Sequence, residues 1–175
     1  MKKEKNIAFI DWQNLHLWTR SEWWEIDLDR FRVYLSDKYN IKKAYYFLWY
    51  VKDENNGLYT SLQEAWFVVV FKKQMVEMQT NKKWNIDSDL IFNVMSKLID
   101  ESKSFNKILL VSGDGDFKIL VDYLIKKKRF LKVLFPNKHY ASSLYNDLMN
   151  KKFDYLINIK SHIEYKSDKK KKRGT

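Results

Sequence analysis

The sequence predicts an α/β protein in which helices cover both faces of a mostly parallel β-sheet, giving three layers. Short apolar runs, typical of buried strands, alternate along the chain with longer segments whose apolar residues recur at helical spacing. A strand followed by a helix and another strand favours parallel pairing. The 175 residues are 45% hydrophobic and 17% aromatic, which is enough for a core and excludes wholesale disorder.

The first half of the chain supplies three predicted strands and two predicted helices. We expect strands over residues 7–10, 43–51 and 74–79, from an apolar run, an aromatic-rich run and an alternating run. We expect helices over 27–39, where Leu28, Phe31, Leu35 and Tyr39 share one face, and over 59–73. The latter includes the β-branched run Val68–Val70. Trp66 is expected in the core on this helix.

The second half continues the alternation. Helices are predicted over 87–102, 117–128 and 141–150. Strands are predicted over 107–111 and 130–135, with a further edge strand within 154–159.

Acidic residues follow several of these strands. Asp11 ends the first, Asp114 and Asp116 follow the strand over 107–111, and Asp87 and Asp89 begin a helix reached from the third strand. Open parallel sheets bind ligands beyond the carboxyl ends of their strands, so we expect all five carboxylates at one edge. Crowded carboxylates repel one another unless a cation neutralises them, and oxygen ligands without His or Cys select Mg²⁺ or Mn²⁺. Such a site is suited to phosphodiester hydrolysis.

Each acid also has a structural interpretation. Asp87 and Asp116 could be helix N-caps, Asp114 could belong to an ordinary turn with the glycine that follows it, and Asp89 could favour the helix dipole. Asp11 has no comparable structural role, because it closes an apolar strand. The coincidence of so many acids at one predicted edge favours a functional site.

Other common sites lack their sequence signals. There is no Gly-rich Walker loop, and the acidic stretches lack the glycine of a calcium-binding EF-hand loop. Ser112 is not surrounded by the glycines of a hydrolase nucleophile elbow. Gly113 and Gly115 instead allow a sharp turn and a close approach of the backbone to a ligand.

Charge and composition indicate which partners the protein has and in which cellular compartment it is found. The net charge is +11, and residues 166–175 contain six lysines and arginines against one acid, Asp168. This favours a polyanionic partner such as nucleic acid, although an A/T-rich genome would also enrich lysine. We expect a domain over 1–165 and a disordered basic tail over 166–175. Without cysteine, a signal peptide or a membrane-spanning apolar stretch, the protein is expected to be cytoplasmic, with no membrane partner.

Three segments of the chain, residues 10–14, 85–90 and 110–117, carry acidic motifs that together resemble a known family, the NYN domains of the PIN-like ribonuclease superfamily, which includes LabA-like proteins. Ile10-Asp-Trp-Gln-Asn14 resembles the Asp-x-x-Asn start of these domains, and Asn85-Ile-Asp-Ser-Asp-Leu90 resembles their central acidic motif. Leu110-Val-Ser-Gly-Asp-Gly-Asp-Phe117 resembles their most diagnostic segment. The resemblance spans roughly residues 7 to 136 in the same order and spacing.

The resemblance implies a Rossmann-like PIN fold with strand order 3-2-1-4-5 and metal-dependent endonucleolytic cleavage of RNA. It implies that Asp11, Asp87, Asp114 and Asp116 are the catalytic, metal-binding acids. Asn14, at a helix start, would orient a ligand or phosphate. A homodimer would also be expected. The remaining substrate contacts expected from the motifs are Trp12, Lys83, Asp89, Asn93 and Ser112.

Two residues depart from the family pattern. Lys83 is followed by Trp84 where the family often has glycine, and Asn93 stands where an acid is usual. Asn93 can coordinate a metal through its carbonyl oxygen but brings no charge.

Three functions are therefore compared. The first is a metal-dependent ribonuclease for single-stranded RNA, in which exposed members of the set Trp12, Trp18, Trp23, Trp24 and Trp84 stack on unpaired bases. The second is a non-catalytic RNA-binding module. The third is a small-molecule phosphohydrolase, against which no Asp-x-Asp motif follows the first strand.

Overall fold

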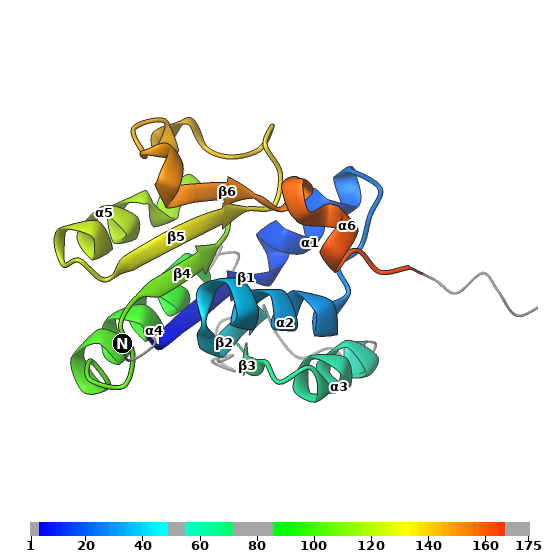
Figure 1. The fold of residues 1–175 in the computed structure, drawn as a ribbon, viewed down its shortest axis with the longest axis horizontal. Helices are drawn as coiled ribbons and strands as arrows, with labels where there is room; N and C mark the ends of the chain where they lie inside the picture. The colour runs from blue at the N-terminus through cyan, green and yellow to red at the C-terminus, as the bar shows by residue number, and fades with distance from the viewer. Residues whose placement is uncertain (1–3, 49–54, 72–85, 167–175) are drawn as a thin grey trace, which may run out of the picture.

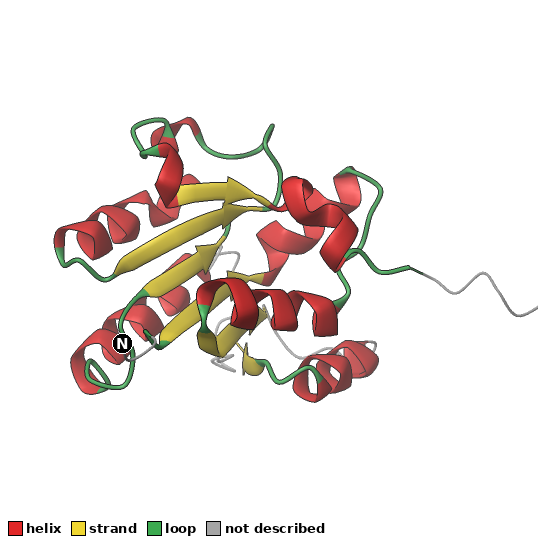
Figure 2. Cartoon of the chain, in the orientation of Figure 1, coloured by secondary structure: helices red, strands yellow, loops and turns green. Residues whose placement is uncertain are grey.

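The computed structural model describes residues 4–48, 55–71 and 86–166 (Figure 1). At its centre is a six-stranded sheet in the order β3-β2-β1-β4-β5-β6, and every neighbouring pair is parallel. The predicted α/β class and the order 3-2-1-4-5 are confirmed, with β6 added beside β5. Figure 2 shows the sheet lying between two layers of helices.

The elements have the following bounds. The strands are β1 Asn6–Asp11, β2 Ile41–Leu48, β3 Val68–Phe71, β4 Ile108–Val111, β5 Phe130–Phe135 and β6 Phe153–Tyr155. The α-helices are α1 Trp12–Ser21, α2 Leu28–Tyr39, α3 Asn56–Glu64, α4 Ile86–Asp100, α5 Lys118–Lys126 and α6 Lys160–Ile163. Short 3₁₀ helices are η2 Gly115–Phe117, η3 Ser143–Tyr145, η4 Asn150–Lys152 and η5 Leu156–Ile159.

Two apolar clusters hold the layers together, one on each face of the sheet. Because successive strand side chains point to opposite faces, Ala8 and Ile10 join one cluster while Ile7 and Phe9 join the other. The first cluster includes buried residues of α1, α2, α3 and α6, and the second includes buried residues of α4 and α5. The three-layer prediction is confirmed by this division.

Helix α2 begins and ends as its sequence predicts. The side chain of Asp27 accepts a hydrogen bond from the backbone N–H of Arg30 at 3.0 Å, which caps the first turn. Asn40, in the left-handed region at φ 51°, ends the helix and turns the chain into β2. Phe31 and Leu35 lie on the buried face between these ends.

The segment predicted as a helix over 59–73 is a helix followed by a strand. Helix α3 ends at Glu64, and Val68–Phe71 forms β3 beside β2. The intervening reversal places Trp66 at φ 62° with 82% of its surface exposed, while Phe67 is buried. The expectation that Trp66 lies in the core was therefore wrong. The strand predicted over 74–79 lies outside the described residues.

The prediction of a helix over 141–150 was also wrong. The structure has only the short helix η3, whose first turn is capped by the Ser142 hydroxyl, and later η4. Tyr145 is buried here against the loop that follows β4. The edge strand predicted within 154–159 is confirmed in part, because β6 ends at Tyr155 and η5 follows.

The end of the described chain folds back on the connection between α1 and α2. Glu164 forms an isolated antiparallel bridge with Ile26, and the backbone N–H of Tyr165 donates to the carbonyl of Glu25 at 2.8 Å. Helix α6 packs on α2 (Figure 1). The division at residue 165 stays a prediction, since 167–175 lie outside the described residues. No helix within the described ranges is long and apolar enough to cross a membrane.

Candidate active site

The candidate site lies where the strand order reverses. Strands β1 and β4 are neighbours, but the chain continues from β1 towards β2 on one side and from β4 towards β5 on the other. Ile10 is paired with Val111. The next residues, Asp11 and Ser112, therefore leave adjacent strands at their carboxyl ends, where open α/β sheets bind ligands.

Asp11 is held firmly in this position. Its exposed fraction is 5%, Oδ1 accepts from the backbone N–H of Asn14 at 3.2 Å, and Oδ2 accepts from the Ser112 hydroxyl at 3.0 Å. Asp11 is thus the N-cap of α1. The interpretation that it has no structural role was wrong. A neutral Asn or Ser caps a helix equally well, however, so capping alone does not account for a buried carboxylate.

The electrostatic setting of Asp11 is unfavourable to its charge. Its pKa is raised to about 6, chiefly by burial and also by the neighbouring negative charge of Asp114, although the hydrogen bonds from Asn14 and Ser112 oppose the rise. In the described part of the chain, neither acid forms an ion pair with lysine or arginine. The two carboxylates therefore lie close together without a compensating cation of the protein.

Asp114 forms the turn that leaves β4. Its Oδ1 accepts from the backbone N–H of Asp116 at 3.0 Å, its own N–H donates to Ser112 Oγ at 3.1 Å, and its carbonyl accepts from the Tyr145 hydroxyl at 2.7 Å. The turn interpretation of Asp114 is confirmed. Asp116 is exposed within η2 and is not the N-cap of α5, which is Phe117.

Asn14 joins the first turn of α1 to the β4 loop. Its Oδ1 accepts from the backbone N–H of Gly113 at 2.7 Å. Among the described residues, no acceptor is bonded to its Nδ2, which is therefore available to a ligand. Gly113 is enclosed, because an added Cβ would lie 3.3 Å from the Tyr140 carbonyl oxygen. Its own carbonyl accepts from the Ser142 N–H at 3.0 Å.

The predicted residues around α4 are only partly described. Asp87 lies in the first turn, but its side chain is outside what the structure describes, and Lys83 is outside entirely. Asp89 is exposed, and Asn93 Nδ2 donates to its backbone carbonyl at 2.8 Å. Helix α4 contacts both β1 and η2, so it borders the site. The described side chains include no group of three His, Cys, Asp or Glu residues that could hold a metal ion.

The described donor set nevertheless suits a divalent cation. A buried carboxylate with a raised pKa, beside a second carboxylate and without an ion-pair partner, gains most from a bound positive charge. All these donors are oxygens, which Mg²⁺ and Mn²⁺ prefer. Ser112 is fully buried, and its hydroxyl donates to Asp11 and accepts from the backbone N–H of Asp114. It therefore positions Asp11 and does not contact a substrate directly.

The tryptophans of the first helix have different surroundings. Trp12, predicted to contact substrate, stacks on His16 with ring centroids 4.9 Å apart and packs against the apolar cluster. Burial lowers the pKa of His16. Trp18, in contrast, stacks on the exposed Tyr140, with ring centroids 3.8 Å apart. As expected for adjacent tryptophans, Trp23 and Trp24 do not both face inward, with exposed fractions of 94% and 3%.

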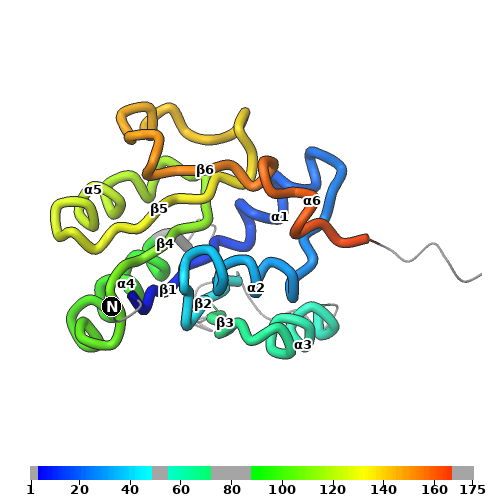
Figure 3. Tube along the Cα trace, in the orientation of Figure 1, coloured from blue at the N-terminus to red at the C-terminus, as the bar shows by residue number. Residues whose placement is uncertain are grey.

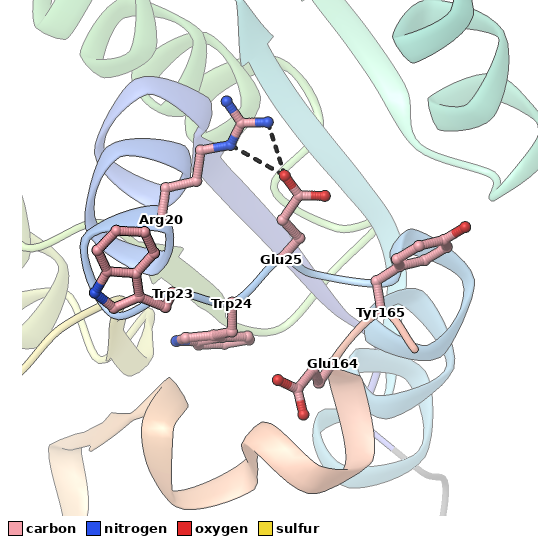
Figure 4. A pocket seen from close by; sticks show the side chains of 6 residues that line it. All are labelled: Arg20, Trp23, Trp24, Glu25, Glu164 and Tyr165. Carbon is pink, nitrogen blue, oxygen red and sulfur yellow. Dashed lines mark hydrogen bonds and ion pairs between the residues drawn. The ribbon is translucent and has the colours of Figure 1, made fainter. Parts of the chain in front are cut away.

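A separate hollow of about 420 Å³ lies at the end of α1 (Figure 4). Its two acids have cationic partners. Glu25 pairs with Arg20 at 2.7 Å, and Glu164 pairs with Lys160 at 3.4 Å. This pairing distinguishes the hollow from the Asp11–Asp114 site.

Sequence reasoning missed the second support of the site. Tyr140, Ser142 and Tyr145 support the loop after β4, but Ser142 and Tyr145 lie in the segment predicted as a helix and Tyr140 directly precedes it. From the sequence, Gly115 was expected to allow the backbone to approach a ligand closely. Its close approach is to the protein itself, since an added Cβ would lie 2.5 Å from Ser142 Oγ.

Comparison with known proteins agrees with this geometry. Residues 6–153 match the model of the NYN domain. The fold resembles the crystal structure of a protein of unknown function from Vibrio parahaemolyticus, with a TM-score of 0.74 and 18% sequence identity over 93% of this chain and 97% of that one. No curated protein matches the chain.

Proposed function

The chain belongs to the NYN domain family, within the PIN-like nuclease superfamily, and on this premise we propose that it is a metal-dependent endoribonuclease acting on single-stranded RNA. The observation that carries the proposal is the buried Asp11 carboxylate beside Asp114, without a cationic partner among the described residues. A protein would not keep this arrangement for helix capping alone, because a neutral residue caps without the cost of burying a charge.

Each residue of the proposed site has a separate task. Asp11 and Asp114 would hold a Mg²⁺ or Mn²⁺ ion, and Asp87 and Asp116 would complete the acidic set. When bound, the ion would activate a water and neutralise the charge that develops on the phosphodiester. Asn14 Nδ2 would donate a hydrogen bond to a phosphate oxygen. Ser112 holds one oxygen of the Asp11 carboxylate and also accepts from the backbone N–H of Asp114.

RNA as the substrate is supported by charge as well as by the family. The net charge of +11 attracts a polyanion and makes its affinity fall with rising salt. Lys83, Asp89 and Asn93 remain proposed substrate contacts at the α4 side of the site.

The decisive experiment compares RNA cleavage by matched carboxylate variants. A labelled single-stranded RNA is incubated with wild type, Asp11→Asn, Asp114→Asn and Asp37→Asn, each with Mg²⁺, Mn²⁺ or EDTA. Asp37 is an exposed acid on α2 and serves as the control for charge removal. We expect wild type and Asp37→Asn to cleave only with metal, and the two site variants to lose activity by about 100-fold or more. Equal cleavage by all four proteins would contradict the assignment.

A non-catalytic RNA-binding module is the second candidate. It is favoured by Asn93, which brings no charge where the family usually has an acid. Salt-sensitive RNA binding that is unchanged by EDTA, without cleavage in either metal, would identify this function instead.

A further inference from the structure

The half-buried Trp18 and the exposed Tyr140 form an aromatic stack beside the candidate site. Their ring centroids are 3.8 Å apart with an interplanar angle of 11°, and Tyr140 is 50% exposed. The stack joins α1 to the segment that follows β5, which passes beside α1 in Figure 3. Asn137 fixes this junction, since its Nδ2 donates to Glu22 Oε1 at 2.9 Å and to the Trp18 carbonyl at 3.4 Å. The two rings are therefore presented on a supported backbone.

The two residues of the stack lie next to Asn14 and Gly113, which belong to the candidate site. Trp18 lies one helical turn after Asn14, so the two side chains are neighbours on one face of α1. Asn14 accepts from the Gly113 N–H, and the Tyr140 carbonyl oxygen closes over Gly113 from the other side. Side chains one turn apart have Cβ atoms about 5–6 Å apart.

We propose that the Trp18–Tyr140 stack binds one unpaired nucleobase of the RNA, next to the phosphodiester held at Asp11 and Asp114. This inference rests on the proposed function. Every base has an aromatic face that can continue such a stack, whereas the bases of a duplex have both faces covered by their neighbours. The stack would therefore select single-stranded RNA without selecting a sequence.

Charge around the stack is consistent with this ligand. Lys138 and His139 precede Tyr140 and are exposed, and in the described part of the chain Lys138 forms no ion pair. An unpaired lysine beside an aromatic face is the combination that binds the phosphate of a stacked nucleotide.

The test measures binding rather than cleavage. Dissociation constants are determined in EDTA by fluorescence polarisation, with a labelled uridine oligonucleotide and a series carrying one abasic nucleotide at successive positions. Trp18→Ala and Tyr140→Ala are compared with the aromatic variants Trp18→Phe and Tyr140→Phe. Trp66→Ala removes a more exposed tryptophan, next to β3, and is the control for loss of a surface indole.

We expect Trp18→Ala and Tyr140→Ala to weaken binding about tenfold, while the phenylalanine variants and Trp66→Ala bind like wild type. One abasic position should weaken wild-type binding by a similar factor and leave Trp18→Ala unaffected. Thermal melting checks that each variant is folded. If Trp18→Ala does not fold, the comparison rests on Tyr140→Ala, because Tyr140 is on an exposed loop. If both alanine variants bind RNA as tightly as wild type and with the same salt dependence, the inference is overturned while the proposed function is not. If wild type neither binds RNA in EDTA nor cleaves it with metal, the proposed function fails, and the inference fails with it.

Discussion

The hydroxyl of Ser112 donates to Oδ2 of Asp11 across 3.0 Å, although the two residues are 101 positions apart in the chain. The same hydroxyl oxygen accepts from the backbone N–H of Asp114. One buried serine thus fixes a strand-end carboxylate relative to the turn that carries the second acid. The contact depends on the pairing of β1 with β4, so the candidate site forms only when the sheet does.

Asp11→Asn should change how stability depends on pH. The pKa of Asp11 rises from 3.8 to about 6 on folding, so the folded protein binds more protons between these values and its stability falls as pH rises through them. The loss amounts to about 3 kcal/mol when complete. In EDTA, Asp11→Asn should therefore be more stable than wild type at pH 8 and nearly equal to it at pH 4. Urea unfolding at both pH values measures the difference, and parallel pH profiles for the two proteins would contradict the raised pKa.

Divalent metal should stabilise the folded protein. An ion that binds only the native state at 100 times its dissociation constant adds about 2.7 kcal/mol to the free energy of unfolding. We expect Mn²⁺ to raise the melting temperature of wild type and of Asp37→Asn, and to leave Asp114→Asn unchanged. Differential scanning fluorimetry over a Mn²⁺ titration checks this. A similar rise in all three proteins would place the metal elsewhere.

Ser112→Ala should shift the acidic limb of the pH–activity profile upwards. The hydrogen bond from Ser112 lowers the pKa of Asp11, so its loss raises that pKa further. A hydrogen bond to a charged group is worth about 1.5–3 kcal/mol, which corresponds to a shift of about one pH unit or more. Ser104→Ala removes an exposed hydroxyl that bonds only to the Glu101 carbonyl and is the control. RNA cleavage rates from pH 5 to 8 provide the profile, and coincident profiles for both variants would argue against this role of Ser112.

Gly115→Ala should destabilise the loop that carries Asp114. An added Cβ would lie 2.5 Å from Ser142 Oγ and 3.0 Å from Leu144 Cδ1, so η3 would have to move away. Such overpacking typically costs about 1–3 kcal/mol. At Gly57, in α3, an added Cβ meets nothing within 4 Å, so Gly57→Ala should instead stabilise the protein by about 0.5–1 kcal/mol. Chemical denaturation measures the free energy of unfolding of the two variants. An unchanged value for Gly115→Ala would show that η3 can move away without cost.

The sequence predicts the central part of the fold well because local and tertiary preferences agree there. Residues 7–10 and 108–111 are unbroken apolar runs, and a strand buried on both faces requires this pattern. The error over 59–73 came from extending a helix into Val68–Phe71, where β-branched side chains favour a strand. The error over 141–150 has a tertiary cause, since Ser142 and Tyr145 bond to the β4 loop instead of continuing a helix.

The sequence predicts those parts of the site whose position follows from the ends of the strands. Asp11 and Asp114 could be expected at one edge because their strands are parallel. The capping role of Asp11 could not be inferred without placing the start of α1 at the next residue. The Trp18–Tyr140 contact was beyond sequence reasoning, because it depends on how the segment after β5 lies over α1.

The return of the chain from α6 to the α1–α2 connection fixes where the lysine-rich terminus starts. Because α2 precedes β2 and runs opposite to it, Ile26 and its partner Glu164 lie towards the edge of the sheet at which Asp11 emerges. Residues 166–175 can extend at most about 30–36 Å, within reach of a strand lying across that edge. Cations held at this place would attract RNA before it docks as well as after, so removing residues 166–175 should slow association as well as speed dissociation.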